Sequence, residues 1–213
     1  MSQDRTYRPL DPVPDLKLYA HLSEKERMIQ GFPYKPADPE LCEGRTRVRK
    51  LCKEFNSLGP DEEETRQKLL KEMLHPDCHD RKIYVEPNFR LDYGYNLKLG
   101  NNFMVNYDCC ILDCSTVEIG ENCLMAPAVQ IYTATHPLNA KYRMDNSDYY
   151  ELAKPVKIGN NCWLGGSCVI CPGVTIGDNV VVGAGSVVVK DVPSNVVVAG
   201  NPAKIIRTMD PPK

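Results

Sequence analysis

The sequence predicts a mainly β fold, a prism of stacked parallel strands with a small helical module at its N-terminal end. Two observations predict it. Aliphatic residues return every six positions over most of residues 80–200, whereas the segment before residue 80 has the apolar spacing of short amphipathic helices. The chain has 213 residues, enough to bury a substantial core, so we expect one main unit with an accessory element.

The six-residue period is clearest between residues 158 and 188. Its aliphatic positions are Ile158, Leu164, Ile170, Ile176, Val182 and Val188, with a fainter copy at Leu99, Val105, Ile111, Ile119, Met125 and Ile131. Six residues are not a helical period, so each unit predicts one short strand and a turn, with the aliphatic side chain pointing inward. Glycine often follows the aliphatic residue, where we expect it to supply backbone conformations that a Cβ would hinder. Stacking of such units buries a continuous apolar interior.

Three helices are predicted before the repeat. Ser23 and Glu26 form a capping-box pattern for the first helix. Asp38 and Pro39 are typical of the N-cap and first turn of the second, and the third follows Asp61. The chain then divides into an N-terminal extension of unassigned role at 1–22, a helical module at 23–79, the β region at 80–200 with an inserted loop at 132–157, and a C-terminal tail at 201–213.

Composition excludes several classes of function. The 26 basic and 28 acidic residues leave a net charge of −2, so we expect no binding to nucleic acid or to anionic membrane. The sequence has no run of about 18 apolar residues and no signal-peptide core, so we expect a soluble cytoplasmic protein. In a reducing compartment the ten cysteines are expected to be free thiols, and their spacing does not match a paired CxxC metal site.

A long interruption in the repeat is the first functional signal. Between Ile131 and Ile158 the period fails for 26 residues and then resumes. Loops of this length are usually functional or disordered, and four tyrosines argue against disorder. The interruption also holds His136, the only histidine after residue 80. Imidazole titrates near neutrality, so His136 is a candidate general base for deprotonating an alcohol, against the plainer reading of a loop histidine with a hydrogen-bond role.

Longer motifs identify a family. Residues from about 24 to 207 resemble the maltose and galactoside O-acetyltransferases, which include the nodulation acetyltransferases. The matching segments are the helical module, FRLDYGYNLKLGNNFMVNYDCCILD, IYTATHP, KIGNNCWLGG, PGVTIGDNVVVGAGSVV and NVVVAGNPAKIIR. The resemblance implies a left-handed parallel β-helix and transfer of an acetyl group from acetyl-CoA to a sugar hydroxyl by direct attack. It also implies a homotrimer with active sites between subunits, and no metal.

The resemblance also implies roles for single residues. His136 would be the general base. The acceptor would be bound by Asn106, Asp38, Asp92 and Asp113. Gly166 would donate its backbone N–H to the thioester oxygen, and Trp163 would pack on the acetyl or pantetheine group. Coenzyme A would be bound by Ala184, Lys190, Lys204 and Arg207.

Two departures and two alternatives qualify this assignment. Galactoside acetyltransferases carry a second sugar-binding aspartate where this chain has Cys114, which leaves the acceptor open, and Lys204 replaces an arginine that is common in some members of the family. A γ-type carbonic anhydrase shares the prism but needs three zinc-binding histidines, which His136 alone does not supply. A non-catalytic β-helix acting as an assembly or regulatory subunit is the other alternative.

Overall fold

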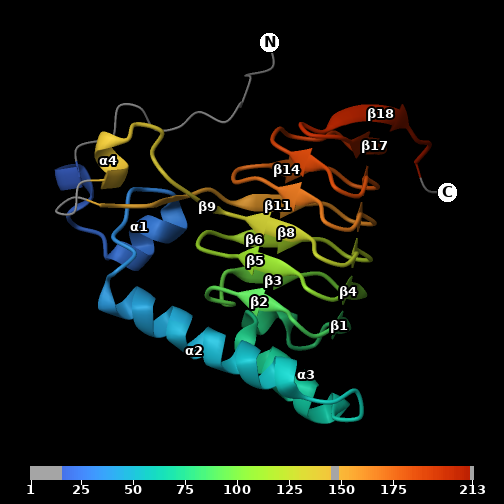
Figure 1. The fold of residues 1–213 in the computed structure, drawn as a ribbon, viewed down its shortest axis with the longest axis horizontal. Helices are drawn as coiled ribbons and strands as arrows, with labels where there is room; N and C mark the ends of the chain where they lie inside the picture. Colours follow the sequence, from blue (N-terminus) through green and yellow to red (C-terminus); the bar gives the residue numbers. More distant parts are fainter. Residues whose placement is uncertain (1–15, 145–148, 212–213) are drawn as a thin grey trace.

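The computed structural model describes residues 16–144 and 149–211. Most of the extension expected at 1–22 lies outside these residues. In the described part the fold is a parallel β-helix with three α-helices before it, and the predicted fold class is confirmed (Figure 1). None of the described helices is long and apolar enough to cross a membrane. The expected cytoplasmic location stays a prediction.

The helical module contains α1 (Glu24–Gln30), α2 (Pro39–Ser57) and α3 (Glu63–Met73), with short 3₁₀ turns η1 (Leu16–Tyr19) and η2 (Pro76–Cys78) beside them. The capping box of Ser23 and Glu26 is present in both directions, and the Asp38 carboxylate accepts the Glu40 N–H at the start of α2. Helices α2 and α3 pack together across the end of the prism that carries β1 (Figure 1). The module therefore covers apolar residues that would otherwise face solvent at this end.

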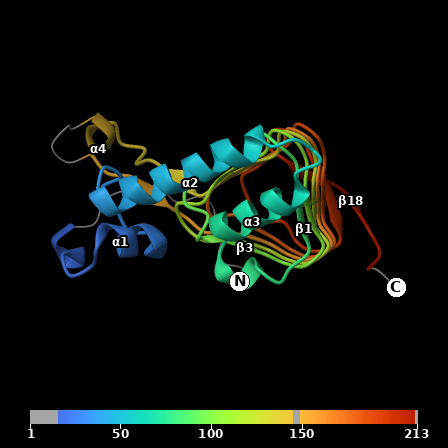
Figure 2. The same ribbon diagram turned by 90° about the horizontal axis from the view of Figure 1, so that it is seen from below.

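Three parallel sheets form the sides of the prism, and the view along its axis shows a triangular section (Figure 2). The seven-stranded sheet contains β1 (Ile83–Val85), β4 (Phe103–Val105), β7 (Leu124–Met125), β12 (Trp163–Leu164), β15 (Val181–Val182), β17 (Val196–Ala199) and the antiparallel β18 (Lys204–Thr208). The five-stranded sheet contains β2 (Arg90–Leu91), β5 (Cys110–Leu112), β8 (Gln130–Tyr132), β13 (Val169–Ile170) and β16 (Val187–Val188). The four-stranded sheet contains β3 (Leu97–Leu99), β6 (Val117–Ile119), β11 (Val156–Ile158) and β14 (Thr175–Ile176).

The predicted aliphatic positions form the core. In the five-stranded sheet Ile111, Ile131, Ile170 and Val188 stand in register, one above the other, and each is at most 1% exposed. The small residues two positions before the aliphatic ones, such as Cys162 and Cys168, are buried beside them. All ten cysteines are free, and seven of them are buried. The interior is thus one continuous apolar column.

The repeat glycines serve close approach between coils, which differs from the reason expected from the sequence. Gly159 does not have a positive φ. A Cβ added there would lie 2.7 Å from the Gly177 carbonyl carbon and from the Asp178 nitrogen, closer than real Cβ atoms stand. The positive φ of the turn is taken by an asparagine two residues later, Asn161, with φ of 56°. Gly100, Gly120 and Gly177 meet the next coil in the same way.

We therefore predict that Gly159→Ala is more destabilising than Gly185→Ala. At Gly159 the added methyl meets the backbone of the next coil, and such overpacking costs about 1–3 kcal/mol. At Gly185 the methyl meets nothing within 4 Å, and the cost comes only from a φ of +68°, roughly 1 kcal/mol. Urea unfolding of both variants measures the difference. A Gly159→Ala loss equal to or below that of Gly185→Ala contradicts the close-approach argument.

Candidate active site

His136 lies at the root of the inserted loop. The chain leaves the five-stranded sheet after β8, forms β9 (Ala134–Thr135) and passes through α4 (Lys141–Met144). It returns through β10 (Leu152–Ala153), which pairs antiparallel with β9. The loop lies on the same side of the prism as α1 (Figures 1 and 2). His136 follows β9 directly and is exposed. Its ring centroid is 6.2 Å from that of Tyr149, with 36° between the planes.

Asp92 and Asp113 lie below this loop, because they follow β2 and β5 of the same sheet. Asp92 is 8% exposed and forms an ion pair with Arg49 at 3.0 Å. The Cys114 thiol lies 3.7 Å from the second Asp92 oxygen. Burial, with the Asp92 charge nearby, raises the pKa of this thiol far above its usual value, so Cys114 stays protonated and donates to the carboxylate. Asp92 therefore has both oxygens engaged within the chain.

Asp113 has no exposed atom. One carboxylate oxygen accepts the N–H groups of Asp92 and Tyr93 at 3.1 and 2.9 Å, and the other accepts the Gly94 N–H at 2.7 Å. Burial raises the pKa of Asp113 to about 7, while the backbone N–H groups of Tyr93 and Gly94 lower it. The carboxylate thus holds the turn that carries Asp92. The contact with the acceptor that the resemblance implied for Asp113 stays a prediction.

Asp38 is also occupied within the chain. Its carboxylate caps α2 by accepting the Glu40 N–H at 3.0 Å. The side chain is half-buried, and its contact with the acceptor stays a prediction. An aspartate at this place has a structural reason of its own, since loss of an N-cap costs about 1 kcal/mol.

A second group of predicted site residues follows strands of the seven-stranded sheet. Asn106 follows β4, Gly166 follows β12 and Ala184 follows β15, so the three lie at one corner of the prism, stacked along its axis. Among the described residues the Gly166 N–H donates no hydrogen bond, while its carbonyl accepts the Gly185 N–H at 2.8 Å. An unused backbone donor is what an oxyanion site needs.

Trp163 lies on the outer face of the seven-stranded sheet, next to this corner. It is 52% exposed and stands in register with Leu124, which is 47% exposed, and with Met104 in the coil beyond. Lys204 and Arg207 lie on β18 of the same sheet, and Lys190 follows β16. All three basic side chains are exposed. The sheet thus presents an apolar strip with positive charge at its C-terminal end.

The predicted site residues therefore lie at two corners of one chain. We call the turns that carry Asn106, Gly166 and Ala184 the tight corner, and the turns and loop that carry Asp92 and His136 the loop corner. The five-stranded sheet separates them, and in the axial view the loop lies opposite β1 and β18 (Figure 2). A single chain does not bring His136 and Trp163 together.

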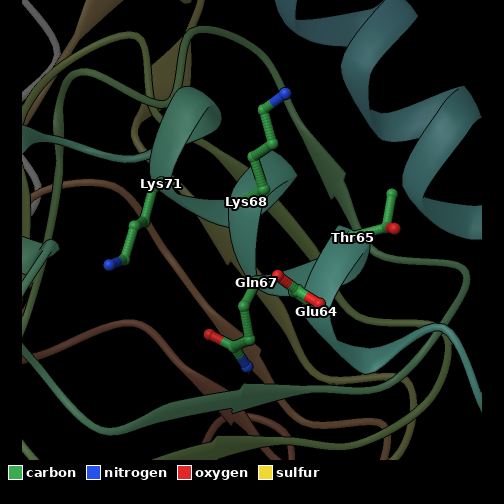
Figure 3. A pocket seen from close by; sticks show the side chains of 5 residues that line it. All are labelled: Glu64, Thr65, Gln67, Lys68 and Lys71. Atoms are coloured by element: carbon green, nitrogen blue, oxygen red, sulfur yellow. The ribbon is translucent and has the colours of Figure 1, made fainter.

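A surface hollow of about 670 Å³ lies elsewhere, over α3, and is lined by Glu64, Thr65, Gln67, Lys68 and Lys71. Its two lysines point away from each other (Figure 3). It contains none of the predicted site residues. Within residues 16–144 and 149–211, no group of three or more His, Cys, Asp or Glu side chains is placed to hold a metal ion.

Comparison with known proteins identifies the family of this chain. A family model described as maltose acetyltransferase hexapeptide capping motif matches residues 27–76, which cover most of the helical module. A second, described as bacterial transferase hexapeptide (six repeats), matches residues 155–190. The crystal structure of a maltose O-acetyltransferase from Clostridium difficile 630 is 46% identical, with a TM-score of 0.83 over 89% of this chain and 99% of that one. The chain belongs to the maltose and galactoside O-acetyltransferase family.

Two further proteins support this membership. A putative acetyltransferase of Dictyostelium discoideum is 47% identical over 87% of this chain and 94% of its own length. The structure of a galactoside acetyltransferase in complex with coenzyme A is 39% identical, with a TM-score of 0.80, over 89% of this chain and 92% of that one. Membership of the maltose and galactoside O-acetyltransferase family makes this protein an acetyltransferase with the hexapeptide fold.

Sequence reasoning missed how the loop of this acetyltransferase is held. Tyr34 and Glu151 form an isolated antiparallel bridge, although 117 positions separate them. The Glu151 carboxylate also accepts the Tyr149 hydroxyl, beside His136. The tyrosines of the loop were visible in the sequence, but no periodic pattern links residue 34 with residue 151.

We predict that Asp113→Asn destabilises the protein by about 1–3 kcal/mol, the cost of leaving a buried polar group unpaired. The asparagine amide keeps one accepting oxygen. Its NH₂ group, however, faces a backbone N–H that the second carboxylate oxygen accepts in the wild-type protein. Urea unfolding measures the loss. The matched control is Asp108→Asn, because Asp108 is exposed and accepts one hydrogen bond, from Asn88 at 2.9 Å. Equal stability of the two variants would exclude the turn-holding role of Asp113.

Proposed function

We propose that this acetyltransferase moves the acetyl group of acetyl-CoA to a hydroxyl of a sugar such as maltose, glucose or a galactoside, with His136 as general base. The observation that carries the proposal is the arrangement at the two corners, which offers an exposed imidazole at one and an unused backbone donor beside an exposed Trp163 at the other. The membership of the family supports both substrates.

The donor is acetyl-CoA. A galactoside acetyltransferase of the same fold is known in complex with coenzyme A. In this chain the apolar strip at Trp163 suits the pantetheine arm, and Ala184, which is small, leaves room for it at the tight corner. The exposed Lys190, Lys204 and Arg207 supply positive charge for the phosphates. This local cluster matters because the net charge of −2 gives no attraction of its own.

The chemistry is direct transfer. His136 takes the proton of the acceptor hydroxyl as its oxygen attacks the thioester carbon. The negative charge that develops on the thioester oxygen is stabilised by the Gly166 N–H. When the carbon–sulfur bond breaks, the thiolate of coenzyme A leaves and the proton returns to it from the imidazolium. Asn106 and Asp92 orient the acceptor. Asp113 holds the turn that carries Asp92, and Asp38 caps α2.

The active unit is a trimer with each site between two chains. Since one chain separates its two corners, the loop corner of one copy must meet the tight corner of the next. Such a contact joins two different surfaces, and it leaves no surface unpaired when three copies close into a ring. The exposed apolar residues Met104, Leu124 and Trp163 support burial of this face.

Two other functions are less well supported. A γ-type carbonic anhydrase requires three histidine ligands, and His136 is the only histidine after residue 80. A non-catalytic assembly subunit would not need His136, Asn106 and Trp163, and all three are present with their side chains at least partly exposed.

We predict that His136→Ala lowers the rate of acetyl transfer by about 10²–10⁴-fold, the usual contribution of a positioned base. Binding of acetyl-CoA should stay similar, because Trp163, Ala184 and the basic residues at the C-terminal end of the sheet, and not His136, are proposed to hold it. The assay follows release of free thiol from acetyl-CoA with maltose, glucose, galactosides and chitooligosaccharides as acceptors. Unchanged turnover in the variant excludes His136 as the base, and a wild-type protein that acetylates none of these acceptors excludes the proposed substrates.

We also predict that mixed trimers of His136→Ala and Trp163→Ala chains regain activity that neither parent has. When the two chains assort at random in equal amounts, about one quarter of the intersubunit sites receive an intact His136 and an intact Trp163. The measurement is thiol release after unfolding and refolding the two variants together, with each variant refolded alone as the control. Activity no higher than the mean of the parents contradicts a shared site.

A further inference from the structure

Glu151 connects the helical module to the loop that carries His136. Its carboxylate accepts two tyrosine hydroxyls, Tyr34 on one oxygen and Tyr149 on the other, each at 2.9 Å. The backbones of Tyr34 and Glu151 also exchange two hydrogen bonds, at 3.1 and 2.9 Å. Directly after Glu151, β10 pairs with β9, and His136 follows β9 directly. The loop is thus fixed on both sides of the imidazole.

The two tyrosines have different surroundings. Tyr34 is 1% exposed and belongs to a buried cluster with Met28, Leu41 and Tyr93, so it is a rigid anchor. Tyr149 is 36% exposed and lies with its ring 6.2 Å from that of His136. Burial and the hydrogen bond to Glu151 raise the pKa of Tyr149 to about 12, so its hydroxyl remains a donor at neutral pH. Glu151 transmits the rigidity of Tyr34 to Tyr149.

His136 needs such support. It is exposed, and within residues 16–144 and 149–211 no hydrogen bond to its imidazole is present. An exposed side chain with no partner samples several rotamers, whereas a general base acts from one geometry. The Tyr149 ring occupies the space on one side of the imidazole and limits these rotamers.

We propose that Glu151 is a positioning residue that holds the Tyr149 ring against His136 and so fixes the direction in which the base faces the acceptor. This proposal rests on the proposed function of His136 as the base. The helical module then has a second role besides covering the end of the prism, because Tyr34 belongs to it. Since the effect is on the direction of the base, it changes kcat and leaves the KM for acetyl-CoA within about twofold.

The test compares Glu151→Ala, which removes both contacts, with Tyr149→Phe, which removes one hydroxyl and keeps the ring. The matched control is Tyr84→Phe. The Tyr84 hydroxyl donates to the Glu86 carboxylate at 2.9 Å, and the two residues are two positions apart, as Tyr149 and Glu151 are. Tyr84 lies on β1 and Glu86 follows it, at the end of the coil stack opposite β18. Should Glu151→Ala fail to fold, Tyr149→Phe still tests the proposal, since it deletes a single oxygen from a side chain that is partly exposed.

Two measurements are made on each protein. The first is the NMR chemical shift of the His136 Hε1 proton, which is sensitive to a neighbouring aromatic ring. The chain has four histidines, so this resonance is assigned by its loss in His136→Ala. The second is kcat and KM from thiol release. We expect Glu151→Ala to move the resonance and to lower kcat about tenfold, within the range that misplacement of a catalytic group causes. Tyr149→Phe should act in the same direction with a smaller effect, and Tyr84→Phe should change neither.

Each outcome decides the proposal. It is overturned if the His136 resonance or kcat is unchanged in both Glu151→Ala and Tyr149→Phe, or if Tyr84→Phe has equal effects. A wild-type protein that acetylates no acceptor contradicts the proposed function separately. In that case the resonance alone decides whether Glu151 and Tyr149 hold His136, and an unmoved resonance in both variants overturns this role.

Discussion

The structure depends on the stacking of one coil on the next through backbone hydrogen bonds between parallel strands. Each coil repeats the register of the one below, so the Ile111, Ile131, Ile170 and Val188 side chains form one apolar column. This spacing leaves no room for a Cβ where the coils approach most closely, as at Gly159. The six-residue period in the sequence therefore follows from a single geometric repeat. The glycines are needed where one coil contacts the next, as well as in the turn.

Stacking also decides where functional groups can lie. Residues at equivalent positions of successive coils lie at the same corner of the prism, whereas residues one hexapeptide apart lie at different corners. Asp92 and His136 lie at the same corner although 43 residues separate them in the chain, whereas Trp163 lies on a different sheet. The proposed site, which needs both His136 and Trp163, therefore requires that two copies of the chain meet.

Much of this was accessible from the sequence. The period gave the strands and the inward residues, and local signals at Ser23 and Asp38 gave the helix starts, because each depends on neighbours in the chain. The handedness did not follow from the period and came from the resemblance. Burial of Asp113 and the contact between Tyr34 and Glu151 were not predictable, since they depend on which residues the coils and the module bring together over long separations. The repeat glycines were also visible in the sequence, but we expected them to supply special backbone conformations, whereas the structure shows that they allow close approach between coils.

The last strand, β18, has a consequence for the behaviour of the protein in solution. A stack of parallel strands ends in unpaired backbone groups that can accept a further coil from another molecule, which is the route to fibres. Here β18 runs antiparallel to β17 and interrupts the parallel order on one side, while α2 and α3 cover the opposite end. Removal of either end should convert a discrete particle into a polymerising one.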